Sequence, residues 1–504
     1  MQTLRCATYE GFDAKVVDVE ATLTKGLPSF SIVGMVSSSI SEAKERVKSA
    51  LLSNEFRFPP KRITINLAPS ELTKSGTQFD LCMALLIVLN ESKENFDEWF
   101  VFGELGLDGS VKENIQLYPL ILSLAKQKCI SKAIVPYDAL DKLSKIPNIA
   151  FYGVKTLQEA IEVLQNKTTT QQFAQEIPLG YDYYEIDGVK YYYIKEYKED
   201  FLDVKGQEIA KRAAVIAAAG FHNIILEGSP GCGKSMIAQR LRYILPPMQE
   251  SEILDLAKLE VLDGKEPSFK PHRPLQSPHH SATTASIFGG GSYKARIGEV
   301  GLANNGVLFF DELPHFSKGV IEALREPLQD NKIRISRVNA KIEYPANFVF
   351  IGAMNPCPCG NLLDEHKECR CNELEIQRYK NRLSDPFLDR IDLYVVMQNI
   401  RSDDKSSLSS KEMHKMVVSA HIFAKERGQK EFNAKLSDED IAKYCTLNEE
   451  AENILSMAVE RFRLSFRSIK KVQKVARTIA DLVQSDTIEK EHILEALSYR
   501  RREA

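Results

Sequence analysis

A glycine-rich segment at residues 228–235 has the composition of a phosphate-binding loop. It follows the pattern G-x-x-x-x-G-K-S and lies between an apolar run at 224–226 and a helical stretch at 236–241. In this context glycines let backbone N–H groups surround phosphates at the start of a helix, while Lys234 reaches the β- and γ-phosphates and the Ser235 hydroxyl binds Mg²⁺. We therefore predict that ATP is held by Gly228, Ser229, Pro230, Gly231, Cys232, Gly233, Lys234 and Ser235.

Two carboxylates follow a second apolar run, at 307–310. If this run is a buried parallel strand, its acids lie at the carboxyl end of the sheet, beside the phosphates. We predict that Asp311 holds Mg²⁺, directly or through water, and that Glu312 orients or deprotonates the attacking water. An apolar run ending in two acids is not specific by itself, and its interpretation depends on the loop upstream.

A third apolar run, at 348–354, ends at Asn355. A neutral amide at this position can donate a hydrogen bond to the γ-phosphate or to the attacking water without adding charge. The alternative is an asparagine that only caps a turn, because its side chain readily bonds to nearby backbone.

Four of the nine cysteines form a cluster directly after this asparagine. Four thiolates suit tetrahedral Zn²⁺, although C-x-C pairs are rarer in zinc sites than C-x-x-C pairs. Reduced free thiols and a redox disulfide remain as alternatives. The predicted zinc ligands are Cys357, Cys359, Cys369 and Cys371.

Several elements must position these residues, and 504 residues suffice for two to four domains. Residues 1–166 alternate β-type and helical stretches, which predicts one α/β domain. Residues 167–200, rich in Thr, Gln and Tyr, have little amphipathic period and are expected to form a linker. The predicted ATPase domain, a parallel-sheet α/β region, covers 201–400, and 401–504 should form a helical lid.

Charge and hydropathy limit the classes of partner. The formal net charge is −3, so contact with nucleic acid requires a local basic surface. The longest apolar run, 81–89, is shorter than the roughly 18 residues needed to span a bilayer, and the N-terminal residues lack the apolar core of a signal peptide. We expect a cytosolic protein without a membrane partner.

Several longer sequence segments, spread over nearly the whole chain, accompany these motifs. In these segments the sequence resembles the magnesium-chelatase-like branch of AAA+ ATPases, specifically the bacterial ComM/YifB family. The resemblance implies a homo-hexameric ring, a helix-2 insert at 279–300, a hairpin at 332–344, and a sensor 1 role for Asn355. The segments that carry it lie at residues 27–34, 62–69, 278–280, 298–303, 354–360 and 389–392.

Three arginines are candidates for the catalytic set. By resemblance to related ring ATPases, Arg390 matches an arginine finger that reaches a neighbour's γ-phosphate, and Arg382 is a rival for that role. Arg467 matches sensor 2 in the lid. The alternative for Arg467 is an ordinary basic helix face, because residues 461–477 contain many Lys and Arg and no acid.

The N-terminal domain resembles the proteolytic domain of Lon but lacks its catalytic dyad. The positions that match the nucleophilic serine and the general-base lysine are Gln78 and Tyr118. An amide cannot act as an acyl-transfer nucleophile, and a phenol of pKa ~10 is a poor base at neutral pH. Ser75 lies nearby in the sequence, so protease activity through this serine remains as a minor alternative.

The resemblance implies a motor on DNA, similar to branch-migration helicases that promote integration of incoming DNA in natural transformation. The predicted hairpin alternates apolar and polar residues, and Lys332, Arg334 and Lys341 would share its exposed side. In a ring these cations would line the channel and contact single-stranded or branched DNA; a solvated hairpin edge is the alternative. The second candidate function is a chelatase-type ATPase subunit that drives metal insertion or remodels a partner protein.

Overall fold

The computed structural model describes residues 2–92, 94–165, 179–290, 296–336, 341–364, 367–400 and 404–501. Within these residues the chain forms two compact units. The first contains the described residues up to Gly180, Leu254–Phe269 and the described part of Ser336–Ile342, and the second contains Tyr181–Ile253, Lys270–Ile335 and residues 343–501. No helix of the described ranges is long and apolar enough to cross a lipid bilayer.

The first unit is built on a mixed seven-stranded sheet in the order β3-β4-β2-β1-β5-β8-β9. The β4-β2-β1 portion is antiparallel, whereas the remaining neighbours are parallel. The strands are β1 (Gln2–Glu10), β2 (Asp13–Thr24), β3 (Ser29–Val33), β4 (Arg62–Ala68), β5 (Phe100–Val101), β8 (Lys132–Pro136) and β9 (Ala150–Val154), with a separate pair β6 (Glu104–Leu105) and β7 (Val111–Lys112).

Helix α2 (Asp80–Val88) lies at the centre of this unit. It is apolar on all sides and almost entirely buried, as expected for a helix with no solvated face. Its one charged residue, Asp80, accepts hydrogen bonds at 2.6 and 3.1 Å from the Arg46 guanidinium of α1. The helices of the unit are α1 (Ser38–Ser53), α2, α3 (Leu117–Lys126), α4 (Leu140–Leu143) and α5 (Leu157–Leu164).

Part of α8 (Glu250–Leu262) also belongs to the first unit, although the sequence placed it in the ATPase domain. The Lys258 ammonium donates to the Phe12 carbonyl at 3.0 Å, and the Tyr118 hydroxyl donates to the Leu254 carbonyl at 3.2 Å. These contacts join the part of α8 after Leu254 to the first unit, at α3 and at the turn between β1 and β2.

The second unit contains a five-stranded, fully parallel sheet in the order β14-β17-β20-β12-β21. The three central strands are buried along their whole length, which matches their continuous apolar sequences. Because all strands run the same way, their carboxyl ends meet at one edge. The strands are β12 (Ile224–Glu227), β14 (Leu275–Gln276), β17 (Val307–Phe310), β20 (Val349–Met354) and β21 (Leu393–Val396).

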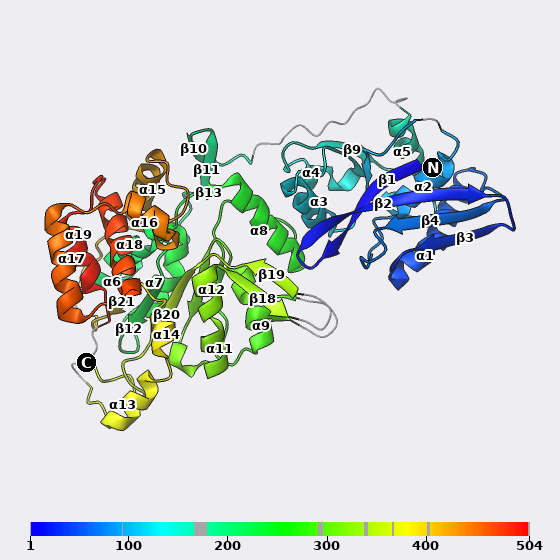
Figure 1. Cartoon of the computed structure of the whole chain (residues 1–504). Coiled ribbons are helices and arrows are strands. Elements are labelled where there is room, and N and C mark those ends of the chain that lie inside the picture. Colours follow the sequence, from blue (N-terminus) through cyan, green and yellow to red (C-terminus); the bar gives the residue numbers. More distant parts are fainter. Residues whose placement is uncertain are drawn as a thin grey trace. The chain divides into compact units, whose positions relative to one another are not determined.

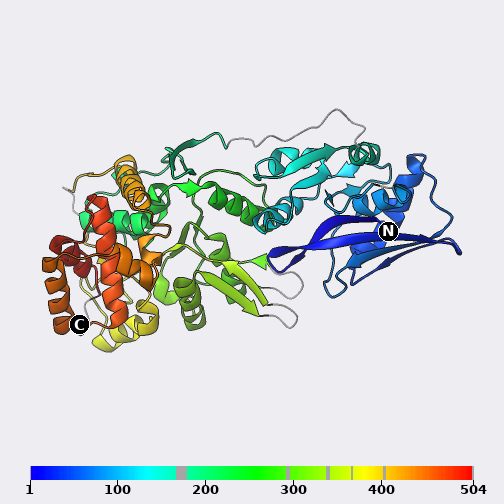
Figure 2. The ribbon, with the colours of Figure 1, turned by 45° about the horizontal axis from the view of Figure 1, so that its top comes forward.

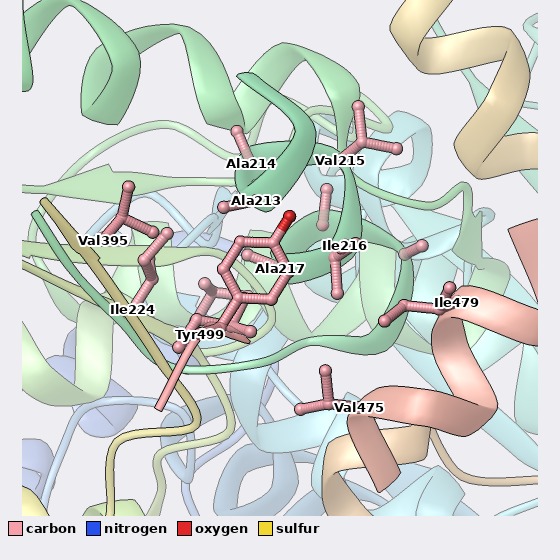
Figure 3. Packing of buried hydrophobic residues seen from close by; sticks show 14 of the residues in the cluster. Ala213, Ala214, Val215, Ile216, Ala217, Ile224, Val395, Val475, Ile479 and Tyr499 are labelled. Carbon is pink, nitrogen blue, oxygen red and sulfur yellow. The ribbon is translucent and has the colours of Figure 1, made fainter. Parts of the chain in front are cut away.

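Helices α15–α19 form the predicted helical lid, grouped together in orange and red in both views (Figures 1 and 2). They share one hydrophobic core with the sheet. Figure 3 shows part of this core, where Ala213 and Ala217 of α6 (Glu208–Gly220) lie in one cluster with Val475 and Ile479 of α18. The lid helices are α15 (Ser410–Glu426), α16 (Asp438–Tyr444), α17 (Glu449–Phe462), α18 (Phe466–Leu482) and α19 (Lys490–Ser498).

Shorter elements surround the parallel sheet. The span expected for the helix-2 insert contains α9 and the β15–β16 ladder, and residues 291–295 lie outside the described ranges. Within the span expected for the hairpin, β18 and β19 pair in a two-stranded sheet, and residues 337–340 lie outside the described ranges. These elements are α7 (Lys234–Leu241), α9 (Thr284–Phe288), α10 (Glu299–Leu302), α11 (Lys318–Ala323), α12 (Arg325–Asp330), α13 (Glu373–Lys380), α14 (Asp385–Leu388), β15 (Gly289–Gly290), β16 (Arg296–Ile297), β18 (Lys332–Ser336) and β19 (Lys341–Pro345).

The tyrosine-rich tract expected to be a linker contains a β-hairpin instead. Its strands β10 (Asp182–Ile186) and β11 (Val189–Tyr193) pair, and β11 extends the sheet to β13 (Met248–Gln249). Tyr197 hydrogen-bonds His414 of α15 at 2.9 Å. Tyrosine suits this contact because its ring packs on apolar surface while its hydroxyl keeps a partner, and Tyr197 is half-buried.

A buried ion cluster stabilises the lid. Arg477 is fully buried and donates from Nε to Asp481 Oδ1 at 3.0 Å, and Arg427 donates from Nη2 to Asp481 Oδ2 at 2.9 Å. The Asn433 amide donates to the same carboxylate at 2.7 Å. Asp481 therefore balances the positive charge of two guanidinium groups inside the helical domain.

We expect Asp481→Ala to destabilise the lid by about 3–5 kcal/mol, because removing one partner leaves buried charge without compensation. The matched control is Glu439→Ala, an exposed acid on α16 whose loss should change stability by less than about 0.5 kcal/mol. Urea unfolding followed by circular dichroism measures both. Equal midpoints for the two variants would contradict the assigned role of Asp481.

Candidate nucleotide-binding site

The phosphate-binding loop joins β12 to α7, and the Lys234 side chain is buried in it. Its ammonium donates to the carbonyls of Gly228 at 2.6 Å and Ser229 at 3.0 Å, and to Asn355 Oδ1 at 3.2 Å. Gly231 and Gly233 have φ angles of 83° and 96°, which glycine adopts without strain. The loop lysine and the predicted sensor amide thus meet at one point.

Ser235 and Asp311 lie together at the same edge of the sheet. The Ser235 hydroxyl, at the start of α7, donates to Asp311 Oδ2, just past β17, at 2.8 Å. The other carboxylate oxygen accepts the Glu312 N–H at 2.9 Å, which fixes the orientation of the carboxylate. A hydroxyl and a carboxylate are the hard oxygen donors that Mg²⁺ prefers, so this pair fits the predicted ion.

Glu312 has a left-handed backbone, with φ 51°, a conformation that costs energy for a residue with a side chain. Its side chain is 58% exposed, and Oε2 lies 3.5 Å from Nδ1 of His280. The sequence analysis assigned His280 no individual role, because this residue was noted only as part of the segment 278–280 that carries the family resemblance. A contact between residues so far apart in the chain has no local sequence signal.

Arg390 and Arg467 lie together, away from the loop of their own chain. Arg390 Nη2 donates to Gln329 Oε1 at 2.7 Å, and Arg467 Nη2 donates to the same oxygen at 3.0 Å. Both line a cavity of about 400 Å³ whose lining includes no residue of 228–235. The sequence did not single out Gln329, because an isolated glutamine matches no motif.

Arg382, the rival finger candidate, has a different environment. Its Nη1 donates to the carbonyl of Pro314 at 2.9 Å, in the short turn that follows Glu312. Arg382 is not among the residues that line the cavity beside Arg390 and Arg467. The two candidates therefore occupy separate places on the domain.

The four clustered cysteines bring their sulfur atoms to within 4.8 Å of one another. Three Sγ–Sγ distances are 3.4, 3.6 and 3.7 Å. Tetrahedral zinc with Zn–S bonds of about 2.3 Å requires sulfurs roughly 3.8 Å apart, whereas a disulfide requires about 2.05 Å. The spacing fits a Cys₄ zinc site.

Backbone donors favour a thiolate at Cys359, whereas burial and the neighbouring cysteines raise the pKa values of Cys369 and Cys371. The N–H groups of Asn361 and Arg370 hydrogen-bond Cys359 Sγ and lower the pKa of this thiol to about 6. The same loop contacts the nucleotide loop, since a Cβ on Gly360 would come within 2.7 Å of Pro230. A metal bound here would therefore stiffen backbone that touches the phosphate-binding loop.

The Lon-like positions are engaged in structural contacts. The Gln78 amide is buried and donates to the carbonyls of Ala7 and Ser75, each at 3.0 Å. Burial raises the pKa of the Tyr118 hydroxyl well above its usual value. Neither side chain supports acyl-transfer chemistry. In the described ranges Ser75 is engaged through its backbone, since its N–H donates to Thr8 Oγ1 at 3.3 Å and its carbonyl accepts from Gln78.

We expect the protein to copurify with about one zinc ion per chain and Cys369→Ser to lose it, because removing one thiolate opens a closed four-ligand site. Cys129→Ser, at an exposed cysteine outside the cluster, is the control and should keep the metal. Elemental analysis measures both. Wild-type protein purified without chelator and found free of metal would contradict the zinc assignment.

Comparison with known proteins identifies relatives along the whole chain. Family models match at residues 200–405 (magnesium chelatase, subunit ChlI), 19–139 (subunit ChlI of Mg-chelatase) and 407–500 (magnesium chelatase, subunit ChlI C-terminal). The "Competence protein ComM" of Haemophilus influenzae is 36% identical over 97% of this chain and 95% of its own length. "Uncharacterized protein YifB" of Escherichia coli is 37% identical with the same coverage, whereas the "Magnesium-chelatase 67 kDa subunit" of Heliobacterium mobile is 26% identical over 30% of this chain. The chain therefore belongs to the ComM/YifB family of magnesium-chelatase-like AAA+ proteins.

Proposed function

We propose that this protein is an ATP-hydrolysing AAA+ motor that works on DNA as a hexameric ring in the cytosol. The observation that carries the proposal is the convergence of Lys234, Asn355 and the Ser235–Asp311 pair at one sheet edge. Similarity to a competence protein supports a ComM-like role, namely branch migration that promotes integration of incoming DNA during transformation.

At the proposed site each side chain has a separate task. Lys234 and the loop N–H groups bind the triphosphate, and Ser235 and Asp311 hold Mg²⁺, which neutralises phosphate charge when bound. Glu312 is exposed toward solvent and accepts the proton of the attacking water. Asn355 orients that water or the γ-phosphate without adding charge.

The arginine pair supports assembly into a ring. Arg390 and Arg467 share Gln329 and line a cavity that contains no residue of their own phosphate-binding loop. We propose that both arginines act on the nucleotide of a neighbouring subunit, with Arg390 as the finger. Removing such a finger typically costs 10³–10⁵ in turnover.

The hairpin β18–β19 is the proposed DNA contact. Lys332 and Arg334 are exposed, whereas Ile333 and Tyr344 are buried, so the hairpin has one solvated basic face. Glu343 pairs with Lys332 at 2.6 Å and with Arg334 at 3.1 Å, which partly neutralises that face. The side chain of Lys341, the third predicted cation, lies outside the described residues.

A chelatase-type ATPase subunit is the second candidate, because the matching family models carry that description. The chelatase subunit of Heliobacterium matches less than a third of the chain, whereas the competence protein matches nearly all of it. ATP hydrolysis measured with and without single-stranded, duplex and branched DNA separates the two functions. Stimulation by DNA supports the motor, and indifference to all three contradicts it.

We expect Lys234→Ala to abolish tight ATP binding, because it removes the cation that contacts the phosphates. Glu312→Gln should bind ATP normally and lose about 10²–10⁴ in turnover, because an amide cannot accept the proton of the water. Nucleotide titration and steady-state hydrolysis measure the two effects. Near-normal hydrolysis by the Glu312→Gln protein would refute the role given to this carboxylate.

Two hairpin variants should shift DNA affinity in opposite directions. Arg334→Ala removes a cation and should weaken binding of all sequences, with a salt slope reduced by about 1. Glu343→Gln releases Lys332 and Arg334 from their pairs and should strengthen binding. Lys411→Ala, at an exposed lysine of α15, is the control for a general loss of positive charge. DNA affinities unchanged in both hairpin variants would restrict the hairpin to a structural role.

A further inference from the structure

Gln329 lies on α12 and joins two arginines that are far apart in the chain. Its Oε1 accepts one hydrogen bond from Arg390, which follows α14, and one from Arg467, at the start of α18. The glutamine is exposed, so its contribution to folding is small. A single side-chain oxygen thus fixes the relative position of the two guanidinium groups.

The surroundings of the pair carry an excess of positive charge. Six cationic side chains and three carboxylates line the adjacent cavity. Three of the lysines use backbone carbonyls as partners: Lys471 donates to Ile391, Lys474 to Ala434, and Lys435 to Phe348. Burial lowers the pKa values of these three lysines, to about 8 in Lys435, so a bound polyphosphate would favour their charged forms.

A neutral amide suits this position better than a carboxylate. An amide oxygen orients the arginines but leaves both charges available, whereas a carboxylate would form an ion pair with them. Burial and the neighbouring Arg467 and Arg325 cations also lower the pKa of Arg390. An anion that enters between the arginines relieves this repulsion.

The same helix leads directly into the hairpin. Only Asp330 and Asn331 separate Gln329 from Lys332, the first residue of β18. Arg334 of the hairpin lies 3.6 Å from Glu326 of α12, and the Asn331 carbonyl accepts the Ala346 N–H at 2.8 Å to close the hairpin base. A displacement of the hairpin therefore moves the segment that holds Gln329.

We propose that Gln329 is a positioning residue that aims Arg390 and Arg467 at the neighbouring subunit's nucleotide and transmits DNA contact at the hairpin to the arginine pair. This inference rests on the proposed function, since it requires a ring with arginines acting between subunits. Within the part of the chain that the structure describes, the Gln329 side chain hydrogen-bonds Arg390 and Arg467, and not the nucleotide loop or the catalytic carboxylates.

Gln329→Met keeps the length of the side chain but removes the shared acceptor. We expect turnover to fall about 10²-fold, as for a displaced catalytic group, with the KM for ATP unchanged because the binding loop is intact. Gln329→Glu should also lower turnover, because it neutralises the arginines. DNA affinity should stay at the wild-type value while stimulation by DNA disappears. Gln377→Met, at an exposed glutamine of α13, is the control.

Mixed rings test whether Gln329 acts with Arg390. A ring that mixes Gln329→Met and Lys234→Ala subunits should recover activity. At some interfaces the intact phosphate-binding loop of a Gln329→Met subunit faces the intact arginine pair of a Lys234→Ala subunit. Gln329→Met mixed with Arg390→Ala should not recover activity, because both defects lie on the same side of the interface. Recovery in this second mixture, or wild-type turnover and DNA stimulation in Gln329→Met, would overturn the inference. Failure of Arg390→Ala to recover with Lys234→Ala would instead overturn the proposed ring mechanism.

Discussion

The parallel direction of five short strands is the constraint on which the site depends. Each strand is joined to its neighbours by backbone hydrogen bonds and covered by apolar layers, so its polar residues are confined to the ends. The register pairs Glu227 with Met354 and Phe310 with Gly352. The loop after β12, the acids after β17 and the amide after β20 therefore emerge side by side. The pairing of the strands is therefore sufficient to place Lys234, Asp311 and Asn355 near one another.

Those parts of the site that follow a strand could be predicted from the sequence, because apolar runs and the residues after them are local signals. The helical lid and the hairpin were predictable for the same reason, since hydrophobic periodicity identifies each element. The contacts of Gln329 and His280 were not predictable. They join residues that no pattern links, and their partners are set by packing rather than by local preference. The β10–β11 hairpin was missed because tyrosines on both faces of its strands obscure the usual alternation of polar and apolar residues.

The loop that carries the four cysteines contacts the phosphate-binding loop, so its rigidity bears on the rigidity of that loop. Asn355 immediately precedes the cluster, and Gly360 within it packs on Pro230 of the phosphate-binding loop. The loop at 228–235 is thus in contact with a segment in which four sulfurs converge. A metal ion that cross-links these sulfurs would restrict motion in a segment with little regular secondary structure, where backbone hydrogen bonds alone give little restraint.

At three places in the described parts of the chain, a pair of cations shares one acceptor, and the acceptor differs with the environment. Asp481 lies between Arg427 and Arg477 in the buried lid, where uncompensated charge is most costly, and the acceptor is a carboxylate. Glu343 lies between Lys332 and Arg334 on an exposed hairpin, where a carboxylate moderates charge at little cost to stability. Only at Arg390 and Arg467 is the shared acceptor an uncharged amide. Folding gains little from this arrangement, because Gln329 and Arg467 are exposed to water. The arrangement is useful where two guanidinium groups must be held in fixed geometry with their charge intact, as in binding the phosphates of another subunit's nucleotide.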